Sequence, residues 1–295
     1  MNFPIVYDEP VFRPPSEAYS LILQITIGCS WNNCAFCEMY TSKKFKARPE
    51  QEVFDEIRAV AAYGQDIRKV FLADGNPLVL STKRLFNIIS ELNRAFPRLN
   101  RISTYALASD ICAKSIEDLK KLREIGLKMI YIGVESGDNE VLGFMNKGET
   151  YETTKEGILK AREAGIKCST ILINGIGGKK YSEQHAINSA KLLNATQPEF
   201  ASTLVLTFHK GLETFKLRYS GEYLPMHTKD LFEEMYTFIS NTELSETIFR
   251  SNHASNYLVL SGILGRDKQM FLDQITTAIN HPELSNLREE WQRGL

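Results

Sequence analysis

Three of the five cysteines in this chain stand within nine residues of the stretch GCSWNNCAFCEMY (28–40), as Cys29, Cys34 and Cys37. Clustered thiols in a chain without export signals are more typical of metal ligands than of disulfides. A structural zinc site usually takes four ligands, and because Cys112 and Cys168 stand alone, a distant His would have to complete it. A [4Fe-4S] cluster usually takes four thiolates, so three would leave one iron open for a reactant.

The composition is that of a globular protein of one large or two smaller α/β domains, with 295 residues, 43% hydrophobic and 24% charged. No run of eighteen apolar residues and no signal peptide is visible, so we expect a cytoplasmic location and no membrane partner. The net charge of −1 provides no general attraction for nucleic acid. We interpret the short basic run Lys43, Lys44, Lys46 and Arg48 as a solvated surface loop.

From residue 20 onward, short aliphatic runs alternate with segments of helical periodicity, which predicts parallel strands with helices outside them. Six strands are expected, at 21–28, 69–73, 101–106, 128–134, 168–174 and 201–208. Between them, Pro49, Ser81 and Ser115 are typical of helix starts, and further helices are expected near 151–164 and 182–194.

Beyond residue 209 the alternation ends. Helices are expected near 228–241, 254–264 and 267–280, with a short strand at 247–250. We therefore divide the chain into an N-terminal extended segment (1–19), a core (20–210) and a mostly helical C-terminal extension (211–295) packed on that core.

The chemically unusual residues follow the predicted strands. The cysteines follow the first strand, Asp74, Gly75 and Asn76 the second, Glu135 the fourth, and Asn174 and Gly175 the fifth. Because active sites of parallel α/β proteins form at the carboxyl ends of the strands, these residues are expected at one site.

These residues, in this order, resemble the radical S-adenosylmethionine (SAM) superfamily, over roughly residues 20–210. Its usual spacing is C-x3-C-x2-C, whereas four residues separate Cys29 from Cys34 here. The resemblance implies a partial (β/α)6 TIM-like barrel, with a [4Fe-4S] cluster on Cys29, Cys34 and Cys37 and SAM bound through its amino and carboxylate groups at the fourth iron.

It also implies cofactor-binding roles. Phe36, before the third cysteine, would lie beside the adenine, and Asp74, Gly75 and Asn76 occupy the place of the segment that receives the amino group. The stretch YIGVESGDNEVLGFMNKG (131–148) looks like the oxygen-independent coproporphyrinogen oxidase and Elongator catalytic-subunit branches. There Glu135 would contact the ribose and Lys147 the carboxylate, and the similarity continues through Asn174 and Gly175. Taken alone, Glu135 and Lys147 would be read as a helix-end charge and a solvated lysine.

Outside the core, His253 and Asn256 are candidate substrate contacts or proton donors. They stand between the strand at 247–250 and the helix predicted from 254, which Ser255 or Asn256 would cap. The competing interpretation is a helix cap with a structural histidine.

The expected function is that of a radical SAM enzyme. It takes one electron from an external donor such as flavodoxin or ferredoxin and cleaves SAM to methionine and a 5′-deoxyadenosyl radical. That radical removes hydrogen from an unidentified substrate, expected to be a small molecule. A tetrapyrrole and an RNA are both conceivable, but the near-neutral charge and the absence of an extensive basic stretch argue against RNA. The alternatives are a non-catalytic iron-sulfur or haem-binding carrier or sensor, and a zinc-binding structural protein.

Overall fold

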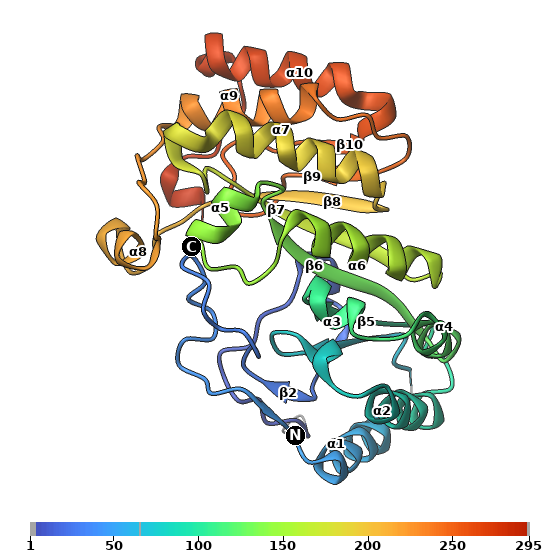
Figure 1. Cartoon of the computed structure of the whole chain (residues 1–295). Coiled ribbons are helices and arrows are strands. Elements are labelled where there is room, and N and C mark those ends of the chain that lie inside the picture. Colours follow the sequence, from blue (N-terminus) through green and yellow to red (C-terminus); the bar gives the residue numbers. More distant parts are fainter. Residues whose placement is uncertain (1–3, 65, 294–295) are drawn as a thin grey trace. The chain divides into compact units, whose positions relative to one another are not determined.

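The computed structural model describes residues 4–64 and 66–293, and these form two compact units (Figure 1). The first unit comprises the residues up to Asn32, Cys37–Ile132 and Glu156–Cys168. The second comprises Asn33–Phe36, Gly133–Lys155 and the residues from Ser169 onward. The chain passes between them several times, and the cysteine stretch itself contributes to both.

In the first unit, parallel strands lie in the order β1-β4-β5-β6, and β6 continues past the unit boundary at Ile132. Their bounds are β1 Leu21–Gln24, β4 Lys69–Ala73, β5 Arg101–Ala106 and β6 Leu127–Glu135. A short antiparallel pair, β2 Thr26–Ile27 and β3 Lys46–Ala47, closes the base of the cysteine loop. Apolar residues of β4 are completely buried, which fits a strand covered on both faces.

The helices of the first unit cover these strands, and α1, α2 and α4 lie side by side (Figure 1). The Ser81 and Ser115 hydroxyls accept hydrogen bonds from backbone N–H groups of α2 and α4, as predicted for N-caps. The bounds are η1 Pro15–Glu17, α1 Glu50–Tyr63, η2 Pro77–Val79, α2 Thr82–Ala95, α3 Ala108–Cys112 and α4 Ile116–Glu124. Helix α6 (Tyr151–Glu163) spans the boundary between the units.

In the second unit the strand order is β7-β8-β9-β10, parallel except for the last pair. The bounds are β7 Lys167–Asn174, β8 Phe200–Val205, β9 Ile248–Arg250 and β10 Ser261–Ile263. Helices α7, α9 and α10 lie one above another beside these strands (Figure 1). The helices are α5 Asn139–Phe144, α7 Gly178–Thr196, α8 Leu212–Arg218, α9 Thr228–Ser240, α10 Leu264–Asn280, η3 Pro282–Leu284 and η4 Glu290–Gln292.

All six predicted strands are present and the α/β class is confirmed. The helix predicted at 254–264 is wrong: this stretch has turns, an extended run and then β10. Its last apolar residues belong to the short strand β10, which pairs with β9. Ser255 and Asn256 therefore cap no helix. The division at 1–19, 20–210 and 211–295 stays a prediction. Within residues 4–64 and 66–293, no helix combines the length and apolar character needed to cross a membrane.

Candidate active site

In the first unit, the turn after β4 holds the start of the cysteine loop. Asp74 is fully buried, and its carboxylate accepts hydrogen bonds from Gly28 N–H (3.0 Å) and Gln24 Nε2 (2.9 Å). Asn76 is also buried and bonds Ser30 twice, through the backbone N–H (2.9 Å) and the hydroxyl (2.8 Å). Both predicted cofactor residues therefore direct their side chains at the backbone that flanks Cys29.

Gly75 brings that turn into direct contact with the loop. Its N–H donates to Gly28 O at 3.1 Å. A Cβ at this position would stand 2.6 Å from Cys29 Cβ and 2.7 Å from Cys29 Cα, which is far inside van der Waals contact. Only glycine allows this approach, so the sequence-based placement of Gly75 beside the cysteines has a clear structural reason.

The basic run after the cysteines is only partly the solvated loop expected from the sequence, because Lys44 and Lys46 are exposed whereas Lys43 and Arg48 are not. Lys43 is buried, and its ammonium group donates to Asp74 Oδ2 (3.0 Å) and Pro10 O (2.8 Å), as well as to Asp8 O. Arg48 bonds Gln24 O and Glu56. Lys43 neutralises the buried Asp74 and Arg48 the partly buried Glu56, and both cations fasten the loop.

Tyr40, which the sequence argument missed, lies beside Cys29 and Cys37. Its ring packs edge-on against Phe12, with 5.6 Å between ring centroids, and the side chain is buried. Burial, and then electrostatic repulsion from the acidic groups of Tyr105, Asp74 and the two cysteines, raise its pKa. In the part of the chain that the structure describes, its hydroxyl has no hydrogen-bond partner. In the sequence, only its position three residues after Cys37 could have pointed to Tyr40.

In the second unit, the segment carrying Cys34 and Phe36 is fastened to Met145, just after α5, and to Arg218 at the end of α8. Ala35 N–H donates to Met145 O (2.8 Å), and the Arg218 guanidinium donates to Cys34 O (2.7 Å). Cys34 is buried, and Phe36 packs against an apolar cluster of α5, β7 and α8 residues. The peptide group between Cys34 and Ala35 is thus held through both its C=O and its N–H.

Glu135 and Lys147 also meet in the second unit, with Lys147 Nζ 3.2 Å from Glu135 Oε1 and both side chains buried. Burial lowers the pKa of Lys147, but the charges of Glu135, Cys34 and Glu149 outweigh it and raise that pKa overall. The interpretation of Lys147 as a solvated lysine is wrong. Gly133 provides the room, since a Cβ there would stand 2.2 Å from Glu135 Oε1.

Asn174 and Gly175 end β7 in the same unit. Gly175 has φ of +86°, and its N–H donates to Glu234 Oε1 at 2.6 Å. Asn174 donates through Nδ2 to Leu231 O (3.1 Å), whereas its buried Oδ1 has no partner within the described residues. Glu234 stands 59 residues beyond Gly175, and nothing in the sequence links the two.

His253 and Asn256 lie near the end of β8. Asn256 is buried and its amide donates to Thr203 O at 2.8 Å. The half-buried imidazole of His253 bonds Ser255 through Nδ1, at 2.9 Å from the hydroxyl and 3.1 Å from the backbone N. Burial and then the Arg288 charge lower the pKa of His253. The Asn256 amide is engaged in holding a loop to β8, which favours a structural role.

Comparison with curated proteins finds relatives that share part of this chain. The haem chaperone HemW of Bacillus subtilis is 25% identical over 180 residues, which cover 58% of this chain and 47% of HemW. A tRNA-2-methylthio-N(6)-dimethylallyladenosine synthase of Chloroherpeton thalassium is 27% identical over 200 residues, covering 64% and 42%. The chain thus spans less than half the length of these two relatives.

Among solved structures, the coproporphyrinogen III oxidase HemN of Escherichia coli matches with a TM-score of 0.58 and 19% identity, over 75% of this chain and 52% of HemN. HemN is a radical SAM enzyme, and the likeness confirms the fold expected from the sequence. The profile of the Radical SAM superfamily matches residues 23–193, more than half of the chain. The chain therefore belongs to the Radical SAM superfamily.

Proposed function

We propose that this protein is a radical SAM enzyme that holds a [4Fe-4S] cluster on Cys29, Cys34 and Cys37 and acts on a small-molecule substrate. The observation that carries the proposal is the loop that bears these thiols. Contacts from Asp74, Gly75 and Asn76 fasten one end of it, and Met145 and Arg218 fasten its middle. Such fastening keeps a loop rigid, and a reactive metal site needs rigid ligands.

The residues present fit such a cluster. The structure shows all three cysteines as thiols, and thiolates are the ligands of iron-sulfur clusters. The buried Tyr40 hydroxyl, beside Cys29 and Cys37, is a donor whose partner is absent from the described protein atoms. Sulfur atoms of a cluster accept hydrogen bonds, so an acceptor-rich group at this place would satisfy it.

SAM would be held mainly by groups of the second unit. The buried ammonium of Lys147 is suited to a carboxylate, Glu135 to ribose hydroxyls and Phe36 to an adenine face. Asn174 and Gly175 would line the same cofactor. Asp74 and Asn76 would act differently from the sequence expectation, by positioning the backbone on either side of Cys29.

When bound and reduced, the cluster and SAM supply a 5′-deoxyadenosyl radical that removes hydrogen from the substrate. The protein's own residues hold the thiolates, orient the cofactor and keep water out of the site. An external donor such as flavodoxin or ferredoxin would deliver the electron. His253 is retained as a candidate substrate contact, because its imidazole is half-buried and uses Nδ1, not Nε2, for its bonds to Ser255.

A second candidate is a non-catalytic haem-binding role, which the similarity to the haem chaperone HemW favours. The two candidates differ in what happens to SAM. An enzyme with a competent cluster cleaves SAM to some extent even without substrate, whereas a carrier leaves it intact.

The test is therefore anaerobic reconstitution, reduction, incubation with SAM alone and quantification of 5′-deoxyadenosine. We expect release by the wild type and by Cys112→Ser, a matched control outside the cluster stretch, and none by Cys34→Ala. Iron content is measured on the same samples. A fully loaded wild-type cluster that releases no 5′-deoxyadenosine would contradict the enzymatic proposal and favour the carrier, and full iron loading in Cys34→Ala would contradict the ligand assignment.

A further inference from the structure

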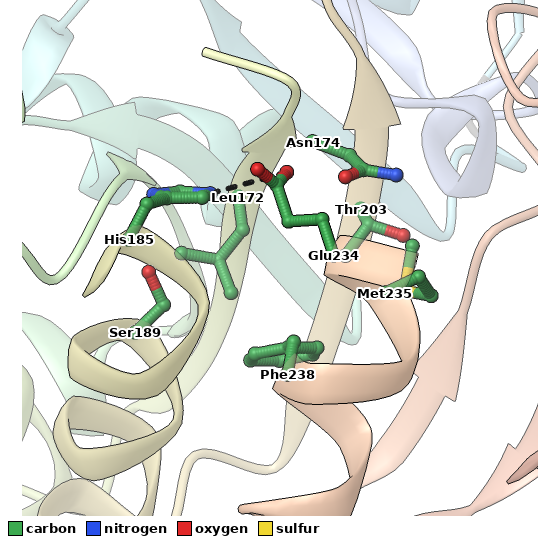
Figure 2. A pocket seen from close by; sticks show the side chains of 8 residues that line it. All are labelled: Leu172, Asn174, His185, Ser189, Thr203, Glu234, Met235 and Phe238. Atoms are coloured by element: carbon green, nitrogen blue, oxygen red, sulfur yellow. Dashed lines mark ion pairs between the residues drawn. The ribbon is translucent and has the colours of Figure 1, made fainter. Parts of the chain in front are cut away.

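A buried carboxylate on α9 holds the turn at the end of β7. Glu234 accepts the Gly175 N–H through Oε1 and the Ser182 hydroxyl through Oε2, both at 2.6 Å. Figure 2 shows Glu234 facing His185 of α7 across the interior of the second unit, with His185 Nε2 3.8 Å from Glu234 Oε1. With two short hydrogen bonds from donors on different elements, the carboxylate connects α9, α7 and the β7 turn.

Other residues of the same C-terminal part hold the rest of this turn. The Tyr223 hydroxyl donates to Gly175 O (2.9 Å), and Lys179 N–H donates to Leu224 O (2.9 Å). The side chain of Leu231 also fills the space that a Cβ on Gly175 would need, at 2.7 Å. Both backbone polar groups of Gly175 are therefore satisfied by residues about fifty or more positions later in the chain. The shape of this turn therefore depends on residues 223–234 as well as on its own sequence, in which Gly175 allows the positive φ and the Gly178 N–H also donates to Gly175 O at 3.1 Å.

A small polar cavity adjoins this contact. It has a volume of about 10 Å³, roughly the room for one water molecule, and Figure 2 shows Asn174, Thr203 and Glu234 among the residues that line it. Within the described residues, Asn174 Oδ1 and Thr203 Oγ1 are buried there without a hydrogen-bond partner. Asn174 thus has one side-chain atom fixed on α9, through Leu231 O, and one that faces Glu234 across the cavity.

We propose that Glu234 is a positioning residue for SAM, through which α9 fixes the Asn174–Gly175 turn in its binding conformation. The inference rests on the proposed function, in which that turn contacts the cofactor. Removing the carboxylate would leave the buried Gly175 N–H and the partly buried Ser182 hydroxyl without their acceptor, so the turn would rearrange to reach water or other partners. Part of the binding energy of SAM would then be spent on restoring the turn.

The measurement is the dissociation constant of SAM for anaerobically reconstituted wild type, Glu234→Gln and Glu234→Leu, by equilibrium dialysis. The carboxamide of Gln can still accept from Gly175 and donate to the Ser182 oxygen, so its affinity stays within a few-fold of wild type. Leu can do neither, and we expect it to weaken binding about tenfold or more. Glu222→Gln is the matched control, since Glu222 pairs with Lys180 at the exposed surface.

Each outcome separates the two proposals. Wild type that carries a cluster but binds no SAM overturns the proposed function and this inference with it. Wild type that binds SAM, with Glu234→Leu equally tight, overturns only the role of Glu234, and so does a loss of affinity in Glu234→Gln as large as in Glu234→Leu. If Glu234→Leu does not fold, Glu234→Asp takes its place: its shorter carboxylate cannot reach both donors, and unchanged affinity there overturns the inference.

Discussion

Lys43 Nζ lies 3.0 Å from Asp74 Oδ2, with both side chains almost completely buried. This ion pair joins the segment after the cysteines to the turn after β4, and Asp74 also accepts the Gly28 N–H just before Cys29. One carboxylate therefore fastens both ends of the cysteine loop within the first unit.

Replacing Asp74 by Ala should be strongly destabilising. It leaves the buried Lys43 ammonium with only the partly exposed Asp8 carboxylate, 3.6 Å away, as counter-charge, and breaking one side of a buried pair costs about 3–5 kcal/mol. Urea denaturation would measure the loss. Glu52→Gln is the control, because Glu52 is mostly exposed and 3.9 Å from Arg48, so its removal should cost less than about 1 kcal/mol. Equal effects of the two substitutions would contradict the assigned role of Asp74.

Gly75→Ala should impair cluster loading more than folding. The new Cβ would stand 2.6 Å from Cys29 Cβ, so Cys29 or the turn has to move, at about 1–3 kcal/mol for an overpacked site. Iron per chain after anaerobic reconstitution should fall, while the urea transition stays cooperative. Gly64→Ala has nothing within 4 Å of its new Cβ and should load iron normally. Normal iron content in Gly75→Ala would show that the close approach is not needed.

The sequence predicts the strands well because a strand shows locally, as an aliphatic run bounded by turn residues. It also predicts the Ser81 and Ser115 caps, since a cap depends on residues within one helical turn. It fails at 254–264, where apolar spacing compatible with a helix instead belongs to turns and a strand that pairs with β9. Pairing with a distant partner overrides local periodicity.

The candidate site is predictable only in part, for the same reason. Cys29 and Gly75 stand out by type, spacing and position after strands. Burial of Lys43 is not visible in a basic run, because it requires Asp74 to arrive from 31 residues away. Glu234 gives no signal at all, since an isolated acidic residue on a helix is ordinary until its contact with Gly175 is seen.

The pH dependence of stability should reveal the titration of Glu234 and His185, two neighbouring buried side chains. Burial raises the pKa of Glu234 from 4.5 to about 7, so the folded protein keeps a proton that the unfolded chain releases. Its contribution to the free energy of unfolding therefore falls as pH rises from about 4.5 to about 7. Burial lowers the pKa of His185 from 6.5 to about 4, and its contribution rises over nearly the same range. The two largely offset each other in the wild type.

Glu234→Gln removes the first contribution and leaves the second. Relative to wild type, its free energy of unfolding should increase between pH 4.5 and pH 7, by an amount on the order of 3 kcal/mol at full titration. Urea denaturation across this range measures the difference. The pH profile of stability of Glu222→Gln, a change at the surface, should run parallel to that of wild type. A parallel profile for Glu234→Gln would mean that Glu234 titrates in the folded protein as it does in the unfolded chain.

Tyr40→Phe should lower the reduction potential of the cluster. The Tyr40 hydroxyl is buried beside Cys29 and Cys37, and a hydrogen bond from it to a cluster or thiolate sulfur would stabilise the more negative, reduced state. Phe keeps the edge-on packing against Phe12 and removes only the donor, so iron content and folding should be unchanged. A redox titration followed by electron paramagnetic resonance measures the potential, with the fully exposed Tyr19→Phe as the control. If Tyr40→Phe titrates at the wild-type potential, the hydroxyl does not donate to the cluster, and another acceptor must account for its burial.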